Sequence, residues 1–219
     1  MAADAGFLIE MKEFIRVEAL SSPTLSSAIR RMLAQPEKVA IFTSKNAVRF
    51  FAEKYLTVPV KEDDWRIYCL ENATRKAVEQ YFPAACICGT APYGADLADL
   101  ILRKEPGNEM YFFCGDRRRD ELPEKLRAHK KNLYELILYE TVLSPQKVSG
   151  TWDGIIFFSP SAVHSFFTSN TLPAQTTCFA IGHATAAALA AHTDHKVVQS
   201  EGLTTEKMIQ TILHYYNPT

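Results

Sequence analysis

The sequence predicts an α/β protein with two lobes, each built around a parallel sheet. Short apolar segments alternate with segments of helical periodicity along the chain, which is typical of parallel α/β sheets. One strand–turn–helix pattern occurs twice, and a long strand-like segment precedes each copy. Together these features indicate two related halves.

Composition indicates an ordinary globular protein of one or two domains. The chain has 219 residues, 47% hydrophobic and 22% charged, with a formal net charge of −1, so we expect no general binding to nucleic acid or anionic membranes. No apolar run approaches the roughly 18 residues of a membrane span, and the start lacks a signal peptide's basic region. The five cysteines include no C-x-x-C pair, so we expect reduced thiols, no metal site and a cytoplasmic protein.

The repeat is clearest at its first strand and turn. Residues 41–51 read IFTSKNAVRFF, and residues 156–166 read IFFSPSAVHSF. Two further pairs follow in the same order: ENATRKAV (71–78) with GHATAAAL (182–189), and the segments around 87–102 and 198–213.

Each half reads as strands followed by helices. The expected strands are Leu8–Val17, Val39–Thr43, Arg66–Leu70, Ala85–Cys88, Met110–Cys114, Leu133–Tyr139, Gly154–Phe158, Thr177–Ile181 and Lys196–Gln199. Helices are expected where apolar residues then recur at helical spacing: Asn46–Tyr55, after Asn72, Ala162–Phe167 and after His183. Ser44 or Asn46 can cap the first of these helices, and Ser159 with Pro160 can begin the third.

Two segments, Leu8–Leu20 and Leu133–Leu143, exceed the usual ~5–6 residues of a strand. One precedes the first copy of the repeat and the other precedes the second. We interpret them as two crossovers between lobes. This predicts an inserted lobe at 18–144, a second lobe made of 1–17 and 145–219, and a cleft between the two.

Small and polar residues follow the strands where helices begin. Ligands of open parallel sheets bind at the carboxyl ends of the strands, and helix N-termini favour carboxylates and phosphates. The sequence therefore predicts anion binding, with these candidate residues: Thr43, Ser44, Thr74, Gly115, Ser159, Ser161, Gly182, His183 and Thr185. The simpler interpretation is that the hydroxyl residues only cap helices.

Positive charge is concentrated in the inserted lobe. Residues 151–219 contain no Arg and only two Lys, whereas 103–131 contain nine basic and six acidic residues. An anionic ligand would take its full positive charges from Lys45, Arg75, Arg117 or Arg119. Arg118 more simply belongs to a solvated helix face.

Cofactor and metal chemistry is disfavoured. His192 and His195 are three residues apart, but no third ligand is evident. The sequence has no Walker A, G-x-G-x-x-G, G-x-S-x-G or H-E-x-x-H pattern. We therefore expect no nucleotide or metal cofactor.

Tyr139 lies in the second crossover, beside the expected cleft. A tyrosine there can donate a proton to a leaving group. The alternative is an amphipathic residue that covers the hinge.

Taken in order, several segments resemble the uroporphyrinogen-III synthase family. They are FTSKNAV (42–48), ENAT (71–74), CGDRRRDELPEKL (114–126), LYETVL (138–143), DGIIFFSPSAV (153–163) and AIGHATAAAL (180–189). The resemblance extends from about Gly6 to Tyr216.

The resemblance implies a cofactor-free monomer with two flavodoxin-like lobes joined by a two-stranded linker. It implies a cyclising hydro-lyase of heme biosynthesis that acts on hydroxymethylbilane, inverts ring D through a spiro intermediate and forms uroporphyrinogen III. A transient contact with the enzyme that makes the bilane would follow. The residues that match the family's cleft are Thr74, Tyr139, Ser159, Ser161 and Thr185, with Tyr139 as proton donor. Ala184 stands where the family has a threonine.

The chain departs from the family pattern at its start. The family opens with a strand, a T-R-P-like turn and a helix, whereas Ala2–Gly6 resembles only the end of that helix, with Gly6 as its C-cap. We therefore expect the opening β–α unit to be absent. Two other functions remain open: a non-catalytic bilobed module that binds anions or tetrapyrroles, and an unrelated two-lobe transferase that uses a sugar nucleotide.

Overall fold

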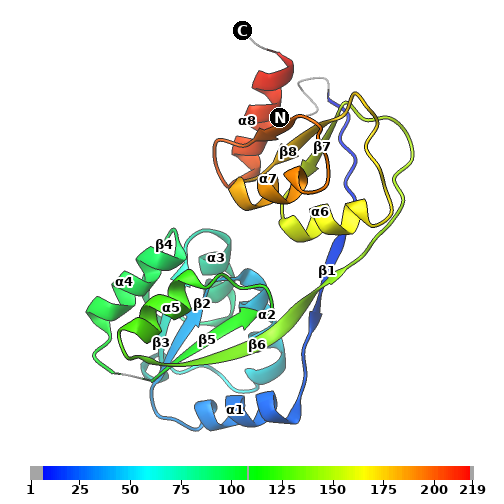
Figure 1. Ribbon diagram of the computed structural model, residues 1–219. Helices are drawn as coiled ribbons and strands as arrows, with labels where there is room; N and C mark the ends of the chain where they lie inside the picture. The colour runs from blue at the N-terminus through cyan, green and yellow to red at the C-terminus, as the bar shows by residue number, and fades with distance from the viewer. Residues whose placement is uncertain (1–6, 108, 218–219) are drawn as a thin grey trace. The chain divides into compact units, whose positions relative to one another are not determined.

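A computed structural model describes residues 7–107 and 109–217 (Figure 1). The described chain divides into two compact units. The central unit spans Val17–Thr141, and the terminal unit combines the chain up to Arg16 with the chain from Val142 onward. We expected these breaks after residues 17 and 144. The helix end expected at 2–6 lies outside the described residues.

The larger sheet has six strands in the order β1-β6-β5-β2-β3-β4. The strands are β1 (Ile15–Ala19), β2 (Lys38–Phe42), β3 (Trp65–Leu70), β4 (Ile87–Ala91), β5 (Glu109–Gly115) and β6 (Asn132–Leu143). Strands β2 to β6 pair in parallel. Strands β3 and β4 lie on one side of β2, and the next strands along the chain, β5 and β6, lie on its other side. The topological switch point therefore lies between β2 and β5.

Helices cover both faces of this sheet (Figure 1). They are α1 (Pro23–Leu33), α2 (Lys45–Tyr55), α3 (Ala73–Tyr81), α4 (Gly94–Lys104) and α5 (Glu121–Ala128), with short 3₁₀ turns at Glu62–Asp64 and Ala84–Cys86. Helices α1 to α3 bury residues such as Phe51 against Phe42 and Phe113. On the opposite face, α4 and α5 bury Leu97 and Leu122 in a second cluster.

The terminal unit has a three-stranded parallel sheet in the order β7-β8-β9. Its elements are β7 (Gly154–Phe157), α6 (Pro160–Phe167), β8 (Thr177–Ala180), α7 (His183–Ala190), β9 (Val197–Gln199) and α8 (Thr205–Tyr216). Helices α6 and α7 cover one face through Val163 and Leu189. Phe179 points to the other face, where its ring meets Tyr215 of α8 at 5.4 Å.

The repeats in the sequence fall on equivalent elements. Strand–helix pairs β2–α2, β3–α3 and β4–α4 correspond to β7–α6, β8–α7 and β9–α8, in the same strand order. The predicted parallel α/β architecture of both halves is confirmed. One difference remains within the described chain: β2 pairs on both sides, whereas β7 pairs only with β8. Beside β7 lies a cavity of about 400 Å³, which residues 8–15 also line.

The strand expected at Leu8–Val17 is wrong from residue 8 to residue 14, because β1 begins at Ile15. Leu8 and Met11 are 87% and 89% exposed, so no sheet face buries them. Backbone hydrogen bonds begin where β6 supplies a partner, from Ser144 N to Phe14 O and from Leu20 N to Leu138 O. As the residue number rises from 14 to 20 on one segment, the number of its partner falls from 144 to 138 on the other. Strands β1 and β6 therefore run antiparallel.

The strand expected at Ala85–Cys88 is displaced along the chain. Residues 84–86 form a 3₁₀ turn closed by a bond from Cys86 N to Pro83 O, and β4 then runs to Ala91. The alternation of apolar and polar residues does not distinguish a short 3₁₀ turn from the start of a strand. No helix within the described ranges is long and apolar enough to cross a membrane.

Candidate functional site

The switch point of the larger sheet brings the ends of β2 and β5 together. Thr43 and Ser44 follow β2, and Gly115 ends β5. Ser44 has an extended backbone, with φ of −141°, and caps α2 by accepting a hydrogen bond from Asn46 N at 3.2 Å. This satisfies a backbone N–H that the first turn of a helix leaves unpaired.

Tyr139 of β6 reaches this capping residue. Its hydroxyl donates to Ser44 Oγ at 2.9 Å, and its ring lies 5.6 Å from that of Phe50 on α2. The ring also lies directly on Gly115, where an added Cβ would come within 2.4 Å of ring carbons Cε2 and Cζ. Only glycine leaves this space, and Tyr139 remains 9% exposed.

The surroundings keep Tyr139 protonated. Burial raises its pKa above the ordinary value of 10.0, and the hydrogen bond with Ser44 opposes part of that rise. Ser44 Oγ accepts from both Tyr139 and Asn46, so its two acceptor positions are occupied and its own hydrogen is left to donate. The pair therefore offers a neutral phenol and a hydroxyl donor at the carboxyl edge of the sheet.

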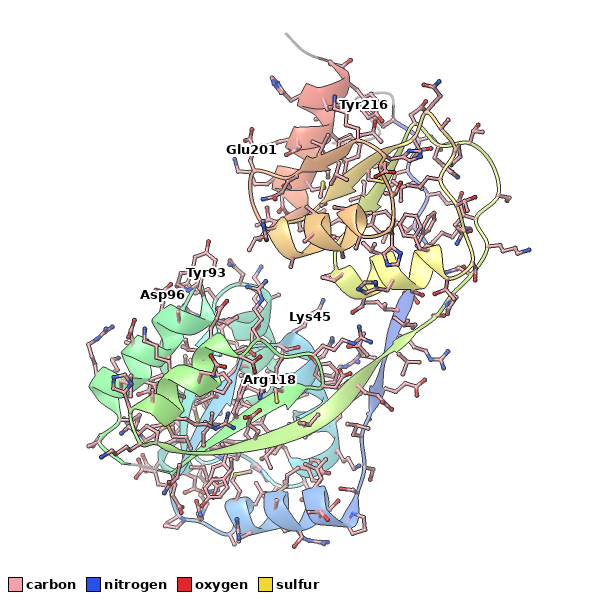
Figure 2. The ribbon with its side chains drawn as sticks, viewed as in Figure 1. Lys45, Tyr93, Asp96, Arg118, Glu201 and Tyr216 are labelled. Carbon is pink, nitrogen blue, oxygen red and sulfur yellow. The ribbon has the colours of Figure 1, made fainter. Side chains whose placement is uncertain are left out.

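Two of the four predicted cationic side chains are unpaired. Lys45 and Arg119 are exposed and make no ion pair with another described residue. Figure 2 shows Lys45 projecting from the start of α2. Arg75 instead pairs with Glu79 one turn along α3, at 2.8 Å. Lys45 and Arg119 are thus the cations of the predicted set available to an anion.

The remaining arginines of the 117–119 run have local partners. Arg117 Nε lies 3.7 Å from Asp116 Oδ2. Arg118, labelled in Figure 2, pairs with both Asp120 and Glu135. Burial opposes ionisation of Glu135, but its hydrogen bonds with arginines prevail and hold its pKa below the ordinary value. The expectation that Arg118 lies on a solvated helix face is wrong, because it precedes α5 and is tied to the sheet through Glu135.

Thr74 lies at the carboxyl end of the neighbouring strand. It falls in the first turn of α3, after β3, and is 6% exposed. Asn72, just before this helix, has φ of 60°, which places its backbone in a region that few residues other than glycine adopt. The chain therefore turns sharply between β3 and α3 and buries Thr74.

The terminal unit repeats this arrangement at adjacent strand ends. Ser159 follows β7 and caps α6, accepting from Ala162 N at 3.1 Å. Gly182 follows β8 and begins α7, with Thr185 almost fully buried and His183 exposed. Ser161 is also buried. The helix-cap interpretation thus holds for Ser44 and Ser159, and in each unit the helix N-termini meet at one sheet edge.

His192 and His195 have separate partners in the terminal unit. His192 contacts His164 through ring nitrogens 2.8 Å apart, whereas His195 bonds to the carbonyl of Thr176 at 3.0 Å. The described part of the chain contains no group of three or more His, Cys, Asp or Glu side chains suited to a metal ion.

Asp116 and Phe50 were not among the predicted site residues, yet both contact Tyr139. Asp116 N donates to Tyr139 O at 3.0 Å, and Asp116 Oδ1 accepts from Thr141 N at 2.9 Å. The available signal was the Gly115-Asp116 pair at a strand end, since Gly and Asp favour turns. Nothing in the local sequence shows that this turn bonds to β6.

The chain is similar to known proteins in both sequence and fold. A family model described as uroporphyrinogen-III synthase HemD matches residues 11–210. The uroporphyrinogen-III synthetase of Helicobacter pylori is a similar solved structure, with 18% identity, a TM-score of 0.67, and coverage of 92% of this chain and 91% of that chain. A mutant uroporphyrinogen III synthase of Thermus thermophilus has 15% identity, a TM-score of 0.59, and coverage of 98% and 90%. At these identities the structures show a shared fold. A search of curated proteins gives no match.

Proposed function

The chain belongs to the uroporphyrinogen-III synthase family, and from this membership we propose that it converts hydroxymethylbilane into uroporphyrinogen III. The bilane's terminal hydroxyl leaves as water, which generates a cationic azafulvene. Attack through a spiro intermediate inverts ring D before the macrocycle closes. The enzyme is then a cyclising hydro-lyase of heme biosynthesis that needs no cofactor.

The observation that carries this proposal is the Tyr139–Ser44 hydroxyl pair at the switch point. Loss of hydroxide needs a proton donor, and the raised pKa of Tyr139 keeps its phenol protonated at neutral pH. Ser44 receives the Tyr139 hydrogen bond and keeps its own hydrogen for a ligand. Tyr139 is therefore the proposed acid, acting through Ser44: Ser44 gives its own hydrogen to the leaving hydroxyl, which departs as water, and takes the Tyr139 proton in its place.

We assign the other candidate residues to binding the carboxylates of the substrate. Hydroxymethylbilane carries eight carboxylates, and helix N-termini favour such groups. We assign Lys45, Arg119 and the first turn of α2 to this role in the central unit. In the terminal unit, Ser159 and Gly182 begin helices at adjacent strand ends. Groups that bind these carboxylates would help to hold the end rings of the substrate for the spiro attack.

We also propose that the protein acts in the cytoplasm as a monomer, with a transient contact to the enzyme that forms the bilane. The five cysteines are free thiols, as expected in a reducing compartment.

Product analysis tests the function. Hydroxymethylbilane is generated in situ, the protein is added, and the type I and type III uroporphyrins are separated after oxidation. The unaided bilane closes to the type I isomer, so an excess of type III over the enzyme-free control is expected. Type I alone would contradict the proposal, and tetrapyrrole binding without turnover would then favour the non-catalytic module.

A further inference from the structure

One extra residue interrupts the pairing of β6 with β5. The partners keep a constant offset from Glu109 and Asn132 up to Cys114 and Ile137, but the next pair is Gly115 with Tyr139. Leu138 is therefore the additional residue of a β-bulge. Bulges bend a strand and re-aim the side chains that follow them.

This bulge decides which face of the sheet Tyr139 occupies. Side chains of a regular strand alternate between the two faces. Glu135 faces α5, where it pairs with Arg127, and Leu138 packs in the cluster beneath α1 to α3. Regular alternation would send Tyr139 to the α5 face with Glu135. Tyr139 instead packs in the same cluster as Leu138, on the side where Ser44 lies.

Asp116 holds this irregular segment at two points. Its backbone N–H donates to Tyr139 O at 3.0 Å, and its carboxylate Oδ1 accepts from Thr141 N at 2.9 Å. A bulge leaves backbone groups without their regular partners. The carboxylate of Asp116 supplies an acceptor for Thr141 N, two residues beyond the displaced tyrosine.

We infer that Asp116 is a positioning residue for Tyr139: by bonding to the backbone on both sides of Glu140, it fixes the bulge that directs the phenol toward Ser44. The catalytic consequence rests on the proposed function, whereas the structural consequence does not. Asp116 holds the segment through an oxygen acceptor, and this hydrogen bond does not require its charge. An asparagine, whose amide oxygen can accept the same hydrogen bond, should therefore replace it.

The first experiment compares Asp116→Ala with Asp116→Asn in the type III assay. We expect the alanine variant to lose at least about tenfold in rate, since a misplacement of about 1 Å can cost roughly 100-fold, and the asparagine variant to stay close to the unmodified protein. Glu140→Ala is the matched control, because it removes an exposed acidic side chain from the same segment. Equal losses in the alanine and asparagine variants would overturn the inference.

A double-mutant cycle separates positioning from general destabilisation. If Asp116 acts through Tyr139, Asp116→Ala costs little further activity in a Tyr139→Phe background. A full and additive loss there would contradict the inference. Should the alanine variant fold poorly, Asp116→Ser gives the same comparison, because its shorter side chain does not reach Thr141 N.

Titration of Tyr139 gives a readout independent of turnover. Phenolate absorbance of each protein is compared with that of its Tyr139→Phe counterpart. Burial and the charge of Asp116 both raise this pKa above 10.0, so both variants should lower it by removing that charge, and Asp116→Ala should lower it further because it also releases the buried phenol. Equal pKa values in the alanine and asparagine variants overturn the inference. If the unmodified protein forms no type III isomer but the pKa still falls further in Asp116→Ala than in Asp116→Asn, positioning stands and the proposed function fails.

Discussion

The hydroxyl groups of Tyr139 and Ser44 lie 2.9 Å apart although 95 positions separate the two residues in the chain. One belongs to β6 and the other caps α2. Their contact joins the two sides of the switch point, where open α/β sheets bind ligands. The hydrogen bond therefore marks the part of the central unit in which chemistry is most directly testable.

Tyr139→Phe should reduce type III formation by about 100-fold, because a positioned general acid contributes about that much or more. Ser159→Ala should cost less, since Ser159 is assigned only substrate binding. Tyr134→Phe is the matched control, because Tyr134 lies on the same strand and stacks on Tyr111 away from Ser44. Wild-type activity in Tyr139→Phe would remove the acid role.

Gly115→Ala should displace the Tyr139 ring and lower activity about as much as Tyr139→Phe does. Its Cβ would lie 2.4 Å from ring carbons, and overpacking of this kind costs about 1–3 kcal/mol of unfolding free energy. Gly107→Ala is the control, because no atom lies within 4 Å of its added Cβ. Urea unfolding and the product assay should separate the two variants; equal behaviour would show that the ring does not depend on Gly115.

Ser159→Ala should destabilise the terminal unit by about 1 kcal/mol, the usual cost of losing an N-cap. The hydroxyl accepts from Ala162 N at 3.1 Å, and alanine leaves that N–H without this acceptor. Urea unfolding followed by hydrogen exchange in α6 measures the loss. Ser149→Ala, in an exposed loop, should change neither. Unchanged hydrogen exchange in α6 of Ser159→Ala would show that the cap contributes no stability.

Buried thiols should make the fold sensitive to alkali. Burial raises the pKa of Cys114 from 9.0 to about 12 and that of Cys178 to about 11. A raised pKa contributes stability that is complete below about pH 9 and is lost as pH rises through these folded values. Urea midpoints should therefore fall between pH 9 and 12.

The same burial sets thiol reactivity. Cys88 is only half-buried, so iodoacetamide should label it well before Cys114 or Cys178 at neutral pH. Mass spectrometry of digested protein identifies the labelled residue, with Cys88→Ser as control. Faster labelling of Cys114 would contradict the burial that raises its pKa.

Sequence by itself determined the repeated α/β architecture and the helix starts. Apolar periodicity and capping depend on residues within a few positions of one another, so Ser44 and Ser159 could be identified as caps without any knowledge of tertiary contacts. The matching segments at 41–51 and 156–166 likewise predicted elements that the structure places in equivalent positions, β2–α2 and β7–α6. The sequence identified Tyr139 as a candidate from the segment around it, but it did not identify Ser44 as its hydrogen-bond partner.

Only the tertiary structure decided the partners and directions. Residues 8–14 have strand-like composition but lack the neighbour that begins to pair with β1 further along the chain. The sequence predicted Arg118 to be a solvated surface residue, but in the folded chain it forms an ion pair with Glu135. The Leu138 bulge turned Tyr139 to the Ser44 side, and Asp116 held it there. Each outcome depends on hydrogen bonds between segments distant in sequence, and local periodicity carries no information about which segments will meet.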